Sequence, residues 1–181
     1  MTDIAVEQPV LGEGIVRRAA AGDETAFAQL IAAHNAAMAR VAYVIVGDRE
    51  QTLDAVQSAW AIAWRRLGSL RDPGQVRSWL IAIAANEARQ QVRRRRRAVV
   101  VDISHAMAAA GAGPSHDEFA QLVDLERALR GLDPDDRRLL ALRYVAELDS
   151  NEIARLVGIS ASGVRSRLSR LLERLREELK K

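Results

Sequence analysis

Apolar residues recur at helical spacing along most of the chain, and short polar turns interrupt them at regular places. Gly22-Asp23 and Gly47-Asp48 each end one helix and supply an aspartate that can cap the next. The pattern predicts helices at about 13–21, 24–46, 49–67, 75–97, 117–130, 134–146, 150–157 and 161–179.

Residues 98–117 break this pattern. Ala108 to Ser115 contains alanine, glycine and one proline without an amphipathic stripe, which is typical of a linker. A compact domain rarely contains such a stretch. The sequence therefore predicts an all-α protein with two small helical domains, at 13–97 and 118–181. A flexible tail (1–12) precedes them, and a flexible linker (98–117) joins them.

Large side chains mark the expected buried face of the third helix. Leu53, Val56, Trp60 and Trp64 share one stripe at helical spacing, so both tryptophans are expected in the core. Hydrophobic residues make up 49% of the chain and aromatic residues only 4%, which favours helix-on-helix packing over a β-sandwich. No stretch approaches the roughly 20 apolar residues of a membrane span, and no signal peptide is evident. We expect a cytoplasmic protein without membrane insertion.

Catalytic and metal-binding chemistry has little support in the sequence. There is no cysteine, which excludes disulfides and thiolate ligands. His34, His105 and His116 fall on separate segments and are expected on the surface or in loops. Neither a nucleophile–base pair nor a metal-ligand spacing is recognisable. We therefore expect no catalytic residue, no metal and no cofactor, and an enzyme is disfavoured.

Residues 149–170 have the pattern of a helix-turn-helix, at the C-terminal end of the second domain. Gly158 suits the left-handed residue of the turn, and Asp149 with Glu152 fits a capping box. The residues expected to hold the two helices together are Ile153, Leu156, Ile159, Val164 and Leu168. Arginine and serine can bind base edges and phosphates in the major groove. The residues expected on this DNA-binding face are Arg165, Ser166, Ser169 and Arg170, with Arg167 at its edge. The alternative is a helical hairpin with a solvated basic face.

The fourth helix carries a second set of candidate DNA contacts. Its donors are Arg77, Asn86, Arg89 and the run Arg93–Arg97, with Trp79 nearby. Basic residues beside aromatic rings suit a single DNA strand, because the charges neutralise the backbone and the rings stack on bases. The alternative interpretation is that the tryptophans are core residues and that the arginine run is a solvated helix end.

In order and spacing, these motifs resemble the extracytoplasmic-function group of bacterial sigma factors in the sigma-70 family. The segments that carry the resemblance, besides the helix-turn-helix, are 15–27, 46–50, 54–57, 63–65, 77–86, 132–134 and 142–144. The family usually has several acidic residues where this chain has Gln51, Thr52 and Leu53. The resemblance implies that 13–97 is a region 2-like domain and 118–181 a region 4-like domain.

The resemblance also implies partners and site residues. Asp54, Gln57 and Ser58 would bind the clamp of the largest subunit of core RNA polymerase. The second domain would sit on the flap of the second-largest subunit and contact the −35 promoter element through its helix-turn-helix. The residues implied for the −10 element are Ser69, Arg71, Arg77, Asn86, Arg89, Arg93 and Arg94. An anti-sigma protein is a further implied partner.

Two other functions remain compatible with the sequence. A transcriptional regulator could use the helix-turn-helix on duplex DNA without docking on polymerase. Alternatively, an interaction protein could keep the fold after losing promoter activity, since the usual acidic residues before Asp54 are absent. Tight binding to duplex DNA by the isolated chain would favour the regulator.

Overall fold

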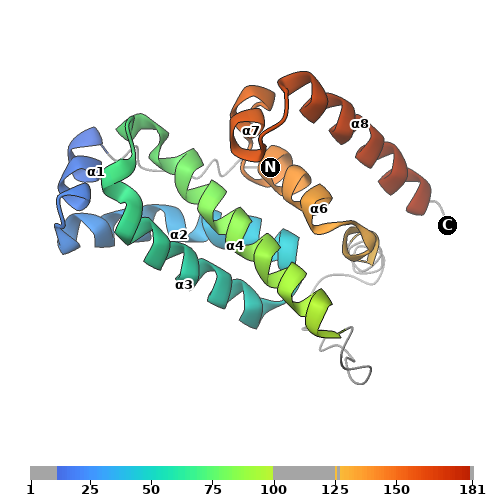
Figure 1. The fold of residues 1–181 in the computed structure, drawn as a ribbon, viewed down its shortest axis with the longest axis horizontal. Helices are drawn as coiled ribbons and strands as arrows, with labels where there is room; N and C mark the ends of the chain where they lie inside the picture. Colours follow the sequence, from blue (N-terminus) through green and yellow to red (C-terminus); the bar gives the residue numbers. More distant parts are fainter. Residues whose placement is uncertain (1–11, 100–124, 126, 180–181) are drawn as a thin grey trace, which may run out of the picture.

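The computed structural model describes residues 12–99, 125 and 127–179 of the chain, and every regular element among them is helical (Figure 1). The predicted all-α class with two helical domains is thus confirmed. The N-terminal half contains α1 (Glu13–Ala20), α2 (Glu24–Val46), α3 (Arg49–Arg66), the short 3-10 turns η1 (Leu67–Ser69) and η2 (Pro73–Gln75), and α4 (Val76–Val99). The C-terminal half contains α6 (Pro134–Leu140), η3 (Ala141–Val145), α7 (Ser150–Val157) and α8 (Ala161–Glu178). The predicted tail and linker lie outside the described residues, apart from Gly12 and the last two residues of α4.

Short-range caps explain where most helices begin and end. The Asp23 carboxylate accepts a hydrogen bond from the Ala26 amide at 3.0 Å, and Asp48 accepts one from Gln51 at 2.9 Å. Gly47 ends α2 in the left-handed conformation (φ 74°), where a side chain would be strained. These caps satisfy amide groups that have no partner within the helix, and they fix the helix limits that the sequence predicts.

α2 is the central helix of the N-terminal half and packs against α1, α3 and α4. The sequence indicates no membrane span, yet α2 is long and apolar enough to cross a membrane, with a mean hydropathy of 1.2. In the structure this apolar surface is core instead: Leu30, Met38, Val41 and Ile45 are all 0% exposed. The core helix of a folded domain can be as long and apolar as a membrane span, and α1, α3 and α4 pack against α2 in this structure.

The predicted helix 134–146 is interrupted. After Leu140 the chain widens into the π-helical turn η3, in which the Ala146 amide donates to the Ala141 carbonyl at 3.0 Å. Glu147 then takes a positive φ of 60°, and the chain returns so that Leu142 and Leu148 are both buried. Packing around both leucines fixes this wide turn, which apolar periodicity alone does not distinguish from an α-helical one.

Two predictions about the buried face of α3 are wrong. Leu53 is 62% exposed and Trp64 is 41% exposed, although Trp60 is buried as predicted. The buried face of α3 is centred on alanines at helical spacing, and these are Ala55, Ala59 and Ala63. Small residues allow a neighbouring helix to approach closely, so α3 turns this face to the core and Leu53 and Trp64 outward. Trp64 retains an edge contact with Phe27, with 4.8 Å between ring centroids.

Candidate nucleic-acid and polymerase interfaces

The helix-turn-helix forms as the sequence predicts. Gly158 adopts the left-handed conformation (φ 76°, ψ 30°) between α7 and α8, and its amide donates to the Ala154 carbonyl at 2.9 Å. Asp149 and Glu152 complete a reciprocal capping box at the start of α7. The backbone hydrogen bonds from Glu152 and Asn151 lower the pKa of the Asp149 carboxyl, so the cap stays charged at neutral pH.

α7 and α8 are held together by part of the apolar set predicted from the sequence. Ile153 and Val164 are fully buried, and Leu168 is nearly so. The sequence predicts Ile159 in this core, but it directly follows the Gly158 turn and is 39% exposed. Ser160, which the sequence analysis did not single out, caps α8 by accepting a hydrogen bond from the Gly163 amide at 3.0 Å.

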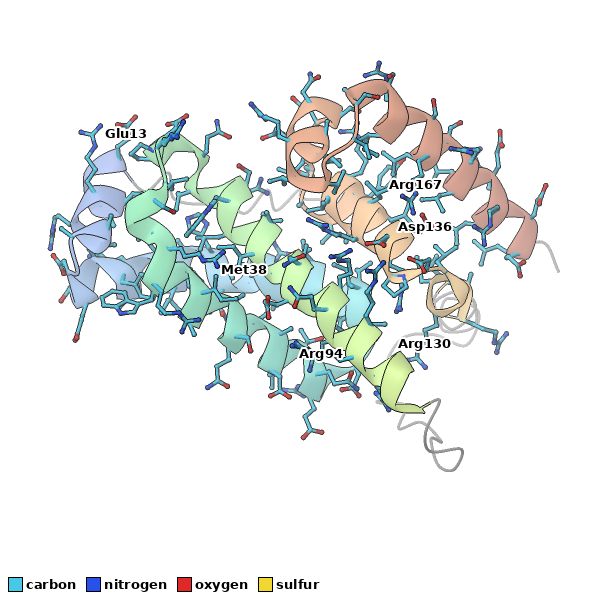
Figure 2. All side chains as sticks on the ribbon, in the orientation of Figure 1. Glu13, Met38, Arg94, Arg130, Asp136 and Arg167 are labelled. Carbon is cyan, nitrogen blue, oxygen red and sulfur yellow. The ribbon has the colours of Figure 1, made fainter. Side chains whose placement is uncertain are left out.

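The outer face of α8 presents the predicted donors to solvent. Arg165, Ser166, Ser169 and Arg170 are all exposed, on the side of α8 opposite its buried leucines. Arg167 differs from them. Its guanidinium forms an ion pair with Asp136 of α6 at 2.6 Å, and both residues are labelled in Figure 2. Arg167 therefore holds α8 against α6, whereas the other four residues form the solvent-exposed face of the helix.

The charged start of α6 is more deeply buried than its sequence suggests. Asp136 is 8% exposed, Arg137 4% and Arg138 9%. Arg138 donates to the Leu156 carbonyl at 3.1 Å, which ties α6 to the end of α7. Burial and the nearby positive charge of Arg89 lower the pKa of Arg138. The sequence did not indicate the burial of Asp136, because Asp135 and Asp136 also fit the simpler role of acidic residues at a helix N-terminus.

The predicted −10 residues fall into two groups. Ser69, Arg71 and Arg94 are exposed, and Asn86 is half-buried on α4. The other three contact the C-terminal half: Arg89 and Arg93 pair with Asp135 at 2.7 and 2.6 Å, and Arg77 donates to the Ala146 carbonyl at 3.1 Å. The arginine row on α4 is thus only partly open to a ligand in this structure. The side chains at 96 and 97 in the predicted arginine run lie outside the described ones.

The predicted polymerase-binding residues share one exposed face of α3. Asp54, Gln57 and Ser58 all point to solvent, and the exposed Leu53 adjoins them. A face with one carboxylate, an amide, a hydroxyl and a large apolar side chain suits contact with a protein surface. The wrong prediction for Leu53 therefore places an additional apolar residue on this candidate docking surface.

Comparisons with known proteins match two parts of the chain to sigma-70 regions. The family description "Sigma-70 region 2" matches residues 30–98, and "Sigma-70, region 4" matches residues 122–175. The chain is 31% identical over 176 residues to the RNA polymerase sigma factor NccH of Alcaligenes xylosoxydans xylosoxydans, a match that covers 92% of this chain and 94% of that protein. The chain belongs to the extracytoplasmic-function sigma factors of the sigma-70 family.

Other relatives of this sigma factor support the same assignment. It is 35% identical over 169 residues to the probable RNA polymerase sigma factor RfaY of Xanthomonas campestris pv. campestris, which covers 89% of this chain but only 42% of that protein. The structure of CnrH in complex with the cytosolic domain of CnrY superposes with a TM-score of 0.69 at 27% identity, covering 93% of this chain and 96% of that one. RpoE from Bartonella quintana, in complex with the anti-sigma factor NepR, superposes with a TM-score of 0.70 at 26% identity, covering 85% and 96%.

His34 of this sigma factor is buried, which corrects the prediction of a surface position. It lies on α2 with 7% of its surface exposed, and neither ring nitrogen has a hydrogen-bond partner among the described residues. Burial lowers the pKa of His34, and the nearby charge of Arg77 lowers it further. The apolar stripe of α2 passes through position 34, so a helical wheel would have indicated the burial. Among residues 12–99, 125 and 127–179, no group of three potential metal-ligating side chains occurs.

The lowered pKa of His34 predicts that acid destabilises the fold. Between this pKa and the ordinary value of 6.5, the unfolded state binds a proton that the folded state does not. The contribution of neutral His34 to stability is therefore complete above pH 6.5 and is lost as the pH falls below it. Urea unfolding at pH 7.5 and 5.5 should show lower stability at pH 5.5, with His34 contributing at most about 1.4 kcal/mol per pH unit. His34→Gln should flatten this dependence, and an unchanged slope in that variant would assign it to other groups.

Proposed function

We propose that this chain directs core RNA polymerase to a defined set of promoters by contacting two promoter elements with its two halves. The observation that carries the proposal is the exposed basic face of α8, on a helix-turn-helix that matches sigma-70 region 4. A second candidate DNA surface lies on α4, within the part that matches region 2. Two DNA surfaces in one chain suit an initiation factor better than a regulator with a single helix-turn-helix.

In this proposal α8 enters the major groove of the −35 element. Arg165 and Arg170 are exposed and can each form paired hydrogen bonds with guanine, while Ser166 and Ser169 bind base edges or phosphates. Arg167 contributes by positioning, because its ion pair with Asp136 fixes the angle between α8 and α6. The distinction between the exposed Arg165 and Arg170 and the ion-paired Arg167 refines the set predicted from the sequence.

In this proposal the loop before α4 and α4 itself contact the −10 element. Ser69 and Arg71 are exposed beside the 3-10 turn η2, where an extruded base of the non-template strand can be held. Asn86, Arg89, Arg93 and Arg94 follow along α4 and can contact the strand backbone. Contact with a melted strand accounts for a row of arginines on a helix that is not part of the helix-turn-helix.

The proposed partners follow from the same surfaces. The face of α3 with Asp54, Gln57 and Ser58 docks on the clamp of the largest polymerase subunit, and the C-terminal half docks on the flap of the second-largest subunit. Two solved neighbours are sigma factors in complexes, CnrH with the cytosolic domain of CnrY and RpoE with the anti-sigma factor NepR. We therefore propose that an anti-sigma factor binds this chain. The chain itself acts in the cytoplasm as a specificity factor for polymerase and not as an enzyme.

Run-off transcription tests the proposal directly. Purified bacterial core polymerase is incubated with sheared genomic DNA, with and without the chain. Discrete new transcripts are expected only when the chain is present, and their aligned upstream sequences should show two conserved elements. A chain that produces no transcripts and does not bind core polymerase, but binds duplex DNA tightly on its own, would instead be a stand-alone regulator.

The docking face of α3 gives a prediction for polymerase binding. Asp54→Arg should greatly reduce the amount of core polymerase that co-purifies with the chain, because it reverses the charge at the centre of the exposed face. Glu24→Arg is the matched control, since Glu24 is equally an exposed acid but lies at the start of α2. Equal retention of polymerase by both variants would move the docking surface away from α3.

A further inference from the structure

The two halves of the chain pack against each other, and the residues at their junction include proposed DNA contacts. α6 and η3 both contact α2 and α4 (Figure 1). Besides Arg93, three arginines form hydrogen bonds across this junction: Arg77 to the Ala146 carbonyl, Arg89 to Asp135, and Arg130 to the Gly47 carbonyl at 3.2 Å. The junction is therefore specific, and it combines apolar packing with directed polar contacts.

We infer that the free chain closes on itself, and that Asp135 is an acidic latch that occupies the DNA-binding arginines of α4. The inference rests on the proposed role of Arg89 and Arg93 in binding the −10 strand. In the closed state these donors are used within the chain, so the isolated protein binds DNA weakly. Opening of the junction releases Asp135 and makes both arginines available.

The geometry of the latch imitates a phosphate group. One carboxylate oxygen of Asp135 accepts from Arg89 Nη1 at 2.7 Å, and the other accepts from Arg93 Nη2 at 2.6 Å. A carboxylate and a phosphate both bind guanidinium groups through short, charge-assisted hydrogen bonds. Asp135 thus engages two successive turns of α4, as the backbone of a DNA strand would. The two ligands compete for the same donors.

The surroundings of Asp135 favour its charged form. Burial raises the pKa of its carboxyl, but the hydrogen bond from Arg89 and the charges of Arg89, Arg93 and Arg138 outweigh this effect and hold the pKa below its usual value. The Asp135 side chain is 27% exposed, compared with 23% for Arg89 and 46% for Arg93. The latch is therefore charged at neutral pH and remains partly accessible to solvent.

The closed state also places the helix-turn-helix beside α4. A cavity of about 190 Å³ lies between them, and its lining includes Arg89, Arg138 and the exposed Ile159 of the turn. A melted strand that contacts Arg89 would have to enter this narrow space. Closure therefore obstructs the strand in addition to neutralising its arginines.

The ion pairs of Asp135 are partly exposed to solvent, which allows the latch to open. Pairs of this kind are screened by salt, and water that reaches them weakens them. A partner that binds the open state more tightly, such as core polymerase, shifts the population by its difference in affinity for the two states. Asp135 thus couples DNA binding to polymerase binding.

The distance between the two halves of the free chain, measured by energy transfer, tests the inference without polymerase or DNA. Because the chain has no cysteine, Gln29→Cys and Glu177→Cys give two unique and exposed positions for a pair of fluorescent dyes, one in each half. Asp135→Asn should lower the energy transfer between the dyes, and so should Arg93→Gln. Glu173→Gln, an exposed charge loss on α8, should leave the transfer unchanged. Circular dichroism verifies that each variant is folded.

Binding to a labelled single-stranded oligonucleotide of mixed sequence provides the second measurement. Asp135→Asn should bind about tenfold more tightly than the parent chain at low salt, because the open state becomes the major population. Arg93→Gln should open the chain without this gain, since it also removes a DNA contact. Energy transfer that stays unchanged in Asp135→Asn would overturn the closed state. Lower transfer without tighter binding would overturn the masking of DNA-binding arginines. Neither result depends on run-off transcription, which tests the sigma function separately.

Discussion

Replacement of Arg165 or Arg170 by alanine should reduce promoter binding by the polymerase complex of this sigma factor by about 5- to 150-fold. This range corresponds to the roughly 1–3 kcal/mol of one paired hydrogen bond between arginine and guanine. Both side chains are exposed on α8, so their loss leaves the buried core of the helix-turn-helix intact. The double variant should lose about the sum of the two free energies, because separate base contacts are nearly additive.

A panel of promoters with single substitutions in the −35 element distinguishes base contacts from phosphate contacts. A base contact predicts that each variant becomes indifferent to the base at one position. Equal losses on every sequence, together with a smaller dependence on salt, would indicate phosphate contacts instead. Arg176→Ala is the matched control, since Arg176 is exposed in the last turn of α8, about three turns from Arg165.

The helix limits and the helix-turn-helix could be predicted because their determinants are local. Asp149 and Glu152 cap each other across three residues, and Gly158 alone provides the left-handed turn. Asp23 and Asp48 similarly bind amides three residues ahead. Interactions over such short separations form whenever the segment is helical, so the residue types and their spacing are sufficient evidence.

The orientation of α3 could not be predicted from its largest side chains. Hydrophobic size favours the stripe through Leu53 and Trp64, yet the structure buries the stripe through Ala55 and Ala59. The closeness of helix packing depends on the facing surface of α4, which the sequence of α3 does not contain. The small residues were the better signal, because alanines at spacings of four mark a face that another helix can approach closely.

Contacts between segments far apart in the chain could not be predicted from the sequence either. Asp135 and Asp136 fit the positive end of a helix dipole, and that role hides their pairing with Arg89, Arg93 and Arg167. The partners lie 31 to 46 residues away along the chain. Such pairs depend on how the two halves pack, and a single sequence gives no measure of this.

Leu142→Ala should lower the free energy of unfolding by about 2–5 kcal/mol, the second large effect expected for this chain. Leu142 is fully buried, and its π-helical turn η3 contacts α2 and α4 in the N-terminal half as well as α6 and α7 in its own half. The cavity left by alanine should therefore weaken both the C-terminal half and the junction. Leu142→Met preserves the side-chain volume and should cost less than about 1.5 kcal/mol.

Two probes of the same urea titration locate the effect. All three tryptophans, Trp60, Trp64 and Trp79, belong to the N-terminal half, so their fluorescence reports on that half, while circular dichroism reports on both. If the junction couples the halves, Leu142→Ala should shift the fluorescence transition as well as the circular dichroism transition, although no tryptophan has been changed. A fluorescence midpoint identical to that of the parent would show that the halves unfold independently. The closed state would then be too weakly populated to mask Arg89 and Arg93, because the ion pairs of Asp135 form only while α6 and η3 pack against α2 and α4.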